Sequence, residues 1–354
     1  MITFPTPLND LVAAIFRASG SAADEAECVA DHLVQANLAG HDSHGIIRVA
    51  EYMHWLKDGK VRTNQKLRIV LESDTLVVAD GQLGYGQAVG AQAMRLGIER
   101  SGRSGTAIVA LRNCGHVGRL GHWAEMAAAE GQVSLHFAST NGLGTLAAPL
   151  GGVERRLSAN PLAVGVPRSG AEPIVLDMAT CSIAEGKLKV ARNSGHHVPE
   201  SCIIDAQGNP TTDPEQYFAN PPGAILPFGG HKGYGLSVLV EILAGALTGN
   251  GCSQRRNSQL EQGMLSIFLD PQRFGTPSSF ENEVQQFVEY IKSSALAAEA
   301  DEILVPGDIE SRNRAQRNDQ GIEIDTTTWE QLVAEARRLG VDKSLIQCAE
   351  QSAC

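Results

Sequence analysis

Two changes in the spacing of apolar residues divide this chain of 354 residues and restrict its fold more than any other feature. In residues 1–66 apolar side chains recur at helical spacing, as in AADEAECVADHLVQANLAG. From Leu67 onward, short β-rich runs such as TLVVADG and GTAIVAL alternate with helical runs. Amphipathic helical patterns then return, as in TTTWEQLVAEARRLG. The sequence therefore predicts an α/β protein with a central α/β domain over residues 67–279 and a helical domain formed by residues 1–66 together with 280–354.

The composition excludes several classes of partner. A formal net charge of −11 opposes broad binding to nucleic acid or to an anionic membrane, because both need clustered Lys and Arg. No apolar run reaches the ~20 residues of a membrane span, and the N-terminal stretch lacks the basic start and cleavage site of a secretory signal. Seven scattered cysteines without a CxxC pair indicate reduced thiols. We therefore expect a cytoplasmic protein that binds a small anionic substrate at a local site.

A glycine-rich turn after TLVVADG resembles a dinucleotide-binding loop. The turn runs from Gly84 to Gly90 with the spacing G-x-G-x-x-x-G, whereas the Rossmann fingerprint is G-x-G-x-x-G. After the next β-rich run come Arg112 and Asn113, where a Rossmann site for NAD needs an acidic residue for the ribose hydroxyls. An NADP site tolerates the arginine. We favour an ordinary glycine-rich turn at the start of a helix.

The stretch NLAGHDSHGIIRVAEYMHWL places two histidines, an aspartate and a serine within four residues. If Asp42 or Ser43 caps a helix, His44 lies in its first turn, and Arg48 follows four residues later on the same face, with the two Cβ atoms ~6 Å apart. A 2-keto or 2-hydroxy acid has its reacting oxygen one carbon from its carboxylate. Arg48 can then hold the carboxylate while His44 exchanges a proton with that oxygen.

Two other interpretations of this stretch stay open. His41, Asp42 and His44 are potential metal ligands of a metal-dependent hydrolase, although ligands this crowded in one turn rarely all point at one ion. Alternatively, Asp42 and Ser43 are only helix caps, His41 is a surface residue and His44 is a satisfied turn histidine.

Six stretches of the chain together resemble the malate/lactate dehydrogenase type-2 family, which includes bacterial hydroxycarboxylate, malate and ureidoglycolate dehydrogenases. In chain order they are the HDSHG stretch, RNCGHVGRLGHWAEMAAAEG, SANPLAVGVP, IVLDMAT, GGHKGYGLSVLVEILAGALTG and LVPGD. The resemblance implies a non-Rossmann fold with a mixed, largely antiparallel sheet and a helical domain. It also implies a homodimer that uses NAD or NADP, without a metal, at a domain and subunit boundary.

The resemblance also assigns roles to individual residues. His44 is the proton donor, Ser43 and Asp177 complete a polar relay with it, and Arg48 binds the substrate carboxylate. In the turn GHVGRLGHW, backbone N–H groups face a cofactor phosphate, whereas His116 in the same turn is more often a structural residue. The implied cofactor contacts are His44, Gly118, Arg119, Leu120, Val175, Leu176, Asp177, Met178, Ala179, His231, Lys232, Gln262, Gly307, Asp308, Ile309 and Glu310.

We therefore predict an oxidoreductase that interconverts a small 2-hydroxy acid and its 2-keto acid, of malate or lactate type. Reduction of a cyclic imino acid, such as piperideine- or pyrroline-2-carboxylate, is the first alternative. Relatives commonly read G-T-N-P where this chain has Ser158-Ala159-Asn160-Pro161, and the missing threonine hydroxyl weakens that alternative. A metal-dependent hydrolase and a non-catalytic ligand-binding protein are the alternatives from other classes.

Overall fold

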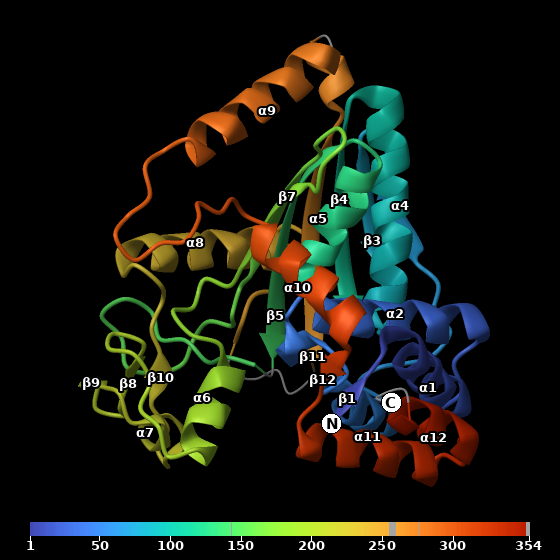
Figure 1. Ribbon diagram of the computed structural model, residues 1–354, viewed down its shortest axis with the longest axis vertical. Coiled ribbons are helices and arrows are strands. Elements are labelled where there is room, and N and C mark those ends of the chain that lie inside the picture. Colours follow the sequence, from blue (N-terminus) through green and yellow to red (C-terminus); the bar gives the residue numbers. More distant parts are fainter. Residues whose placement is uncertain (143, 255–259, 276, 352–354) are drawn as a thin grey trace.

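A seven-stranded mixed sheet forms the centre of the computed structural model, which describes residues 1–142, 144–254, 260–275 and 277–351 (Figure 1). Neighbouring strands are antiparallel except β3 and β4, which pair in parallel. This arrangement confirms the predicted mixed, largely antiparallel sheet. The strands in spatial order are β2 (Arg68–Glu72), β3 (Leu76–Asp80), β4 (Thr106–Cys114), β11 (Leu260–Leu269), β5 (Val133–Gly142), β6 (Leu162–Val166) and β7 (Ile174–Met178).

Two helices, α4 (Gly86–Ser104) and α5 (Leu120–Ala129), cover one face of this sheet (Figure 1). Alternate residues of the strands point toward them and form one buried cluster with residues of the two helices, in which Trp123 of α5 and Phe268 of β11 are the largest members. Alternation of buried and exposed residues is the pattern expected for a sheet with one covered face. The cluster fixes the register of the strands that carry the site.

The glycine-rich turn at Gly84–Gly90 serves chain packing. It connects β3 to α4 within the one parallel strand pair, which explains its likeness to a Rossmann unit. A Cβ on Gly86 would lie 2.3 Å from the carbonyl oxygen of His116, and the Gly84 carbonyl accepts from the Gly115 N–H at 2.9 Å. Because the protein's own backbone covers the start of α4, no dinucleotide phosphate fits there.

Helices from both ends of the chain share a second hydrophobic cluster. The N-terminal helices are α1 (Pro5–Ala18), α2 (Ala23–Leu38) and α3 (Arg48–Lys57), and the C-terminal ones are α11 (Thr326–Arg338) and α12 (Lys343–Gln351). Asp325 caps α11 by accepting from the Thr328 N–H at 2.9 Å, and Trp329, Leu332 and Ala336 form its buried stripe. β1 (Ile2–Thr3) pairs with β12 (Ile322–Glu323) beside them.

One C-terminal helix departs from the predicted split helical domain. α9 (Pro277–Lys292) contacts the short helix η3 (Pro271–Arg273) and lies at the opposite end of the sheet from α11 and α12 (Figure 1). Its amphipathic pattern showed that one face needs a partner but did not identify that partner. The other boundaries of the predicted domains stay a prediction.

A small lobe projects from the sheet beyond β7. It contains a three-stranded sheet in the order β10 (Ala224–Ile225), β8 (Ile203–Ile204), β9 (Pro210–Thr211), with the helices α6 (Glu185–Asn193) and α7 (Pro214–Phe218). The lobe has its own hydrophobic cluster around the buried Tyr217. After it, α8 (His231–Glu241) continues as a π-helical turn, η2 (Ile242–Ala246), against β5 and β11. Finally, α10 (Asp308–Gln320) packs on α2.

Two further observations bear on the compartment expected from the sequence. Within the described ranges, none of the helices has both the length and the apolar character that crossing a bilayer demands. The cysteines among these residues are Cys28, Cys114, Cys181, Cys202, Cys252 and Cys348, and all of them are unpaired. The cytoplasmic location stays a prediction.

Candidate active site

His44 lies in a tight turn between α2 and α3. The turn contains a 3-10 helix, η1 (Asp42–His44), and α3 begins only at Arg48, without a cap from Asp42 or Ser43. The predicted geometry, with His44 and Arg48 on one face of a helix, is therefore wrong. Instead, the guanidinium of Arg48 reaches back, and its Nε donates to the Ser43 carbonyl oxygen at 2.7 Å. The imidazole and the guanidinium still belong to one turn.

A buried asparagine and a distant arginine hold this turn. Asn37, which is 4% exposed at the end of α2, donates to Asp42 Oδ1 at 2.6 Å and accepts from the Ile46 N–H at 2.9 Å. Arg317 of α10 donates to both carboxylate oxygens of Asp42, at 2.7 and 3.0 Å. A bidentate pair restrains direction as well as distance. Asp42, predicted as a cap or a metal ligand, therefore anchors the turn that carries His44.

The imidazole of His44 is bonded on one side and open on the other. Its Nδ1 lies 3.0 Å from Ser43 Oγ, as predicted for the first part of the relay. Its Nε2 makes no hydrogen bond within the described residues and is not among their buried unpartnered atoms. Desolvation, followed by the positive charges of Arg48, His41 and Arg119, lowers the pKa of His44 to about 3. Neutral His44 is therefore able to accept a proton through Nε2 at pH 7.

The guanidinium of Arg48 has one edge left for a ligand. Its Nε is occupied by the Ser43 carbonyl, and its Nη1 donates to Glu51 Oε2 at 2.6 Å on the next turn of α3. Within the described residues its Nη2 has no protein partner, and the side chain is 30% exposed. Arg48 is therefore available to a carboxylate, as predicted, but Glu51 competes for it.

A second histidine, His116, which the sequence analysis ranked as more often structural, lies against His44. The rings of His44 and His116 stack with centroids 5.5 Å apart and an interplanar angle of 22°. The Nδ1 of His116 is 2.6 Å from the hydroxyl of Tyr52, which in turn accepts from Gln87 Nε2 at 2.8 Å. Burial, together with the nearby Arg48 and His44, holds the pKa of His116 well below its usual value. The site therefore contains two neutral imidazoles.

The predicted relay through Asp177 is not formed. Asp177 Oδ2 accepts from the Gly121 N–H at 2.8 Å, so β7 caps the start of α5. Among the residues that the structure describes, no hydrogen bond joins Asp177 to Ser43 or His44. Burial raises the pKa of Asp177, although His41 and Arg119 partly offset this effect. The relay therefore consists of Ser43 and His44 alone.

The turn before α5 differs from the predicted phosphate loop at one amide. The Arg119 N–H donates to the buried His32 Nε2 at 2.9 Å, so it does not face a phosphate. The Arg119 side chain is 2% exposed and forms an ion pair with Glu125, which also pairs with Arg314. An external anion therefore does not reach Arg119, because both its amide and its guanidinium are directed into the protein.

Gln262 supports the same turn from β11. Its Oε1 accepts from the Val117 N–H at 2.8 Å, and its Nε2 donates to Thr140 Oγ1 at 2.8 Å. Its polar atoms thus hold the backbone next to His116. A direct contact of Gln262 with the cofactor stays a prediction, and in this structure its observed contacts are structural.

The first residues of α10 lie beside β7. The Val175 N–H donates to the Pro306 carbonyl at 3.0 Å, and a Cβ on Gly307 would lie 3.0 Å from the Pro173 carbonyl oxygen. Glu310 lies 3.2 Å from His41 Nε2, which connects α10 to the His44 turn. The structure thus brings together four of the predicted segments, which are residues 41–48, 116–121, 175–179 and 307–310.

His231 and Lys232 occupy the exposed start of α8. The loop before this helix is tied to the end of β7, because the Phe228 N–H donates to the Thr180 carbonyl at 3.1 Å. The first turn of α8 contains no acidic residue, so the partial positive charge of the helix start is not neutralised there. These two predicted contact residues therefore lie at a site that favours an anion.

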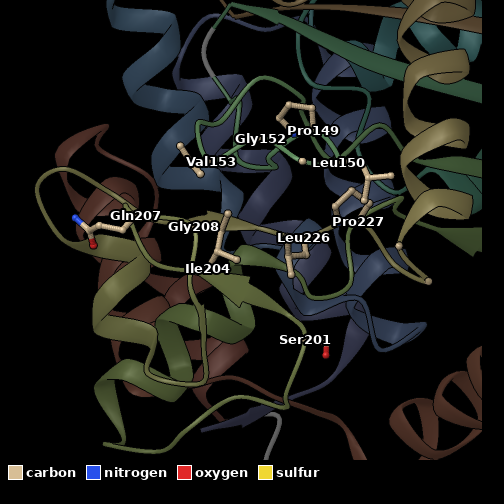
Figure 2. A pocket seen from close by; sticks show the side chains of 13 residues that line it. Pro149, Leu150, Gly152, Val153, Ser201, Ile204, Gln207, Gly208, Leu226 and Pro227 are labelled. Carbon is tan, nitrogen blue, oxygen red and sulfur yellow. The ribbon is translucent and has the colours of Figure 1, made fainter.

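A hollow of about 590 Å³ lies between the small lobe and the loop before α8 (Figure 2). Its walls include apolar side chains such as Leu150, Ile204 and Leu226. The backbone of several glycines, among them Gly229 and Gly230 just before α8, also lines the hollow. The lining includes neither a titratable side chain nor His44 or His116. The hollow therefore has no group for proton transfer, and the reactive groups lie elsewhere.

The potential metal ligands of the HDSH stretch are directed to different partners. His41 faces Glu310, Asp42 faces Arg317, and His44 faces Ser43. Within the described ranges, no group of three His, Cys, Asp or Glu side chains has a geometry that holds a metal ion. This divergence removes the structural basis for a shared ion at the HDSH stretch.

Known proteins resemble the chain over nearly its whole length. Hydroxycarboxylate dehydrogenase B of Escherichia coli O157:H7 is 40% identical over 345 residues, which is 96% of this chain and 95% of that protein. An L-lactate dehydrogenase of Cupriavidus necator is 39% identical over 340 residues, which is 95% of this chain and 97% of that protein.

Solved structures share the fold. One from E. coli, attributed to a malate/lactate dehydrogenase, superimposes with a TM-score of 0.94 at 38% identity and covers 100% of both chains. A Δ1-piperideine-2-carboxylate reductase from Pseudomonas syringae superimposes with a TM-score of 0.81 at 30% identity, over 95% of this chain and 100% of that chain. The family model described as malate/L-lactate dehydrogenase matches residues 5–333. The chain belongs to the malate/L-lactate dehydrogenase family.

Proposed function

We propose that this protein interconverts a small 2-hydroxy acid and its 2-keto acid by hydride exchange with NAD or NADP. The pairing of His44 with Arg48 carries the proposal, because an imidazole with an open Nε2 shares a turn with a guanidinium that has one free edge. A 2-hydroxy acid needs these two groups close together, since its hydroxyl lies one carbon from its carboxylate. The relatives named for lactate and hydroxycarboxylate act on substrates of this class.

The neutral state of His44 at pH 7 suits the oxidation of a hydroxy acid, because an imidazolium could not accept the hydroxyl proton. At pH 7 its neutral Nε2 accepts the hydroxyl proton, while Ser43 restrains the ring through Nδ1. In the reverse direction His44 must first be protonated. A carboxylate bound to Arg48 cancels part of the positive charge that opposes this step, so substrate binding raises the pKa of His44.

A dinucleotide cofactor supplies or accepts the hydride when it is bound. The start of α8 fits the anionic part of such a cofactor, because His231 and Lys232 are exposed there beside unneutralised helix N–H groups. The start of α5 fits it less well, since Arg119 is buried and its amide is bonded to His32. The end of β7 connects the two places through the bonds at Thr180 and Asp177. We assign the phosphate contacts to α8.

The second candidate is reduction of a cyclic imino acid, which the structural likeness to a piperideine-carboxylate reductase favours. The SANP segment argues against it. Ser158 bonds to the Asn160 side chain, and Asn160 Nδ2 donates to the buried Glu241 at 2.7 Å, so these polar groups are turned into the protein. At Ala159 the chain lacks the hydroxyl that a threonine would provide. We therefore rank the imino acid second.

A panel of substrates and cofactors tests the proposed function. Reduced NAD and reduced NADP are each mixed with the protein and with pyruvate, oxaloacetate, larger 2-keto acids or a cyclic imine carboxylate, and nicotinamide absorbance is followed. We expect oxidation of one reduced cofactor by at least one keto acid. Turnover of the imine alone would reverse the ranking, and no change with any compound would refute a dehydrogenase.

We also infer that the protein works as a homodimer, and the face of the central sheet opposite α4 and α5 supports this. On this face, directly opposed residues of six strands form one continuous apolar row. Its members are half-buried except Ile108, which is 38% exposed. A large apolar face of this kind is typical of a protein interface. The row consists of Leu76, Ile108, Ile267, Leu135, Val164 and Leu176.

Light scattering tests the homodimer with two matched variants. Ile108→Glu places a charge in the apolar row, and we expect it to shift the protein from dimer toward monomer. Ile69→Glu is the control, because Ile69 is also 38% exposed but pairs with the inward-facing Ala79 on the other face of the sheet. A monomeric wild type, or a dimer unaffected by Ile108→Glu, would contradict the proposed interface.

A further inference from the structure

A buried chain of two hydrogen bonds ends on His116. Gln87 of α4 is fully buried and donates through Nε2 to the hydroxyl oxygen of Tyr52 at 2.8 Å. Tyr52 of α3 is 1% exposed, and its hydroxyl lies 2.6 Å from His116 Nδ1. A phenol has only one proton to donate. Because Gln87 already donates to the oxygen, this proton is directed to Nδ1 of His116.

The protonation states of the chain agree with this direction. Burial raises the pKa of the Tyr52 phenol far above neutrality, so the hydroxyl keeps its proton. Burial and the positive charge of Arg48, together with His44, disfavour an imidazolium at His116. Glu51 is the acidic group that faces this end of α3, and it is engaged by Arg48. A neutral His116 that accepts at Nδ1 must carry its own proton on Nε2.

The Nε2 of His116 is open. It makes no hydrogen bond within the described part of the chain, and it is absent from the buried polar atoms that lack a partner there. Stacking at 5.5 Å keeps this ring against that of His44, whose Nε2 is open as well. In each ring, Nδ1 is hydrogen-bonded to a hydroxyl group. The hydroxyl of Ser43 bonds to His44, and the hydroxyl of Tyr52 bonds to His116.

We propose that Gln87 and Tyr52 are positioning residues that hold His116 as its Nε2–H tautomer, and that His116 is a catalytic hydrogen-bond donor to the reacting oxygen of the substrate. The inference rests on the proposed function and divides the work between the two imidazoles. His44 exchanges the proton with that oxygen, whereas His116 stays neutral and stabilises the negative charge that develops on it. A preorganised neutral donor of this kind lowers the barrier without transferring its proton.

The tautomer is measured directly in protein without substrate. Long-range ¹H–¹⁵N spectra of protein labelled with ¹⁵N-histidine distinguish a protonated from an unprotonated ring nitrogen, and the His116→Gln variant identifies the resonances. We expect a protonated Nε2 and an unprotonated Nδ1 for His116 at neutral pH. A protonated Nδ1 with a bare Nε2, or an imidazolium, would overturn the proposal.

Two conservative variants test the positioning residues. Tyr52→Phe keeps the aromatic packing but frees Nδ1, and Gln87→Met keeps the side-chain length but lets the tyrosine hydroxyl turn. We expect both to lower kcat by about tenfold or more while cofactor affinity stays unchanged, and to change the His116 nitrogen shifts. Tyr85→Phe is the matched control, because Tyr85 is equally buried in the same aromatic cluster without a bond to His116.

The outcomes separate the two proposals. A fall in kcat for Tyr52→Phe with wild-type nitrogen shifts, or an equal fall for Tyr85→Phe, would overturn the positioning role. A protein with the Nε2–H tautomer that turns over no keto acid would support the tautomer and refute the proposed dehydrogenase activity instead.

Discussion

A methyl group added at Gly45 should displace the turn that carries His44. Gly45 has φ −87°, a value that alanine adopts without strain, so the effect of Gly45→Ala is steric. The new Cβ would lie 2.1 Å from Asn37 Oδ1 and 2.4 Å from Asn37 Cγ. Ordinary contact needs about 3.5 Å between heavy atoms, so the Asn37 amide must move by roughly 1 Å. It then cannot keep its bonds to both Asp42 and Ile46.

The expected destabilisation follows from these two bonds. Each hydrogen bond contributes about 1 kcal/mol net, and a buried polar group left without a partner costs about 1–3 kcal/mol. Asn37 is 4% exposed, so water does not readily replace the lost partners. We expect Gly45→Ala to lower the free energy of unfolding by about 2–4 kcal/mol. Because a shift of about 1 Å at a catalytic group can cost ~100-fold in rate, kcat should fall as well.

Urea unfolding followed by tryptophan fluorescence, with steady-state kinetics alongside, measures both effects. The control is Gly102→Ala on α4, where the nearest heavy atom to the new Cβ is Gln132 Nε2 at 3.7 Å. Alanine is the better helix former, so this control should match the wild type or gain about 0.5–1 kcal/mol. A Gly45→Ala protein that unfolds at the wild-type urea concentration and keeps its kcat would show that the Asn37 bonds do not hold the His44 turn.

Three further predictions concern the substrate clamp, a buried histidine of β5 and the metal alternative. Arg48→Met should raise KM for the keto acid about 10–100-fold with a smaller change in kcat, since it removes a charged hydrogen bond to substrate, and unchanged KM would contradict the clamp. The pKa of the buried His136 is lowered to about 3, so the unfolded chain binds its proton first as the pH falls below ~6.5. The free energy of unfolding of a His136→Gln variant should therefore fall by about 2 kcal/mol less than that of the wild type between pH 7 and pH 5, and an equal fall in both proteins would count against this histidine. Chelation by EDTA should leave turnover unchanged, whereas parallel loss of bound zinc and activity would restore the hydrolase alternative.

The sequence predicted much of the fold because its strongest signals are local. Hydrophobic periodicity located most helices and strands, and the spacing of Gly84–Gly90 argued correctly against a Rossmann loop. The spacing of His44 and Arg48 predicted their proximity but assigned the wrong geometry. Asp42 and Ser43 read as helix caps, whereas the bidentate partner of Asp42 is Arg317, which lies 275 residues away. A local pattern contains no information about such a partner.

The part of the site around His116 depends on contacts between segments that are distant in the sequence. Tyr52 belongs to an apolar helical stripe and reads as a core residue, and Gln87 is an ordinary polar residue in a helix start. Only folding brings their bonds together on His116. In the same way, the sequence predicts the Arg119 amide as a phosphate ligand, whereas in the structure this N–H donates to His32 of α2. The sequence does contain one signal for this turn, which is Gly118, because glycine is the usual residue where the backbone needs a positive φ. In the structure its φ is 73°.

In the proposed mechanism, His44 moves the proton that accompanies hydride transfer. The His44→Gln variant tests it most directly, because glutamine keeps a polar side chain of similar size but cannot exchange a proton at neutral pH. The measurement compares kcat in both reaction directions with cofactor affinity, read from the fluorescence of the reduced nicotinamide. We expect kcat to fall by about 100-fold or more while cofactor binding stays at the wild-type level. A kcat close to that of the wild type would contradict it.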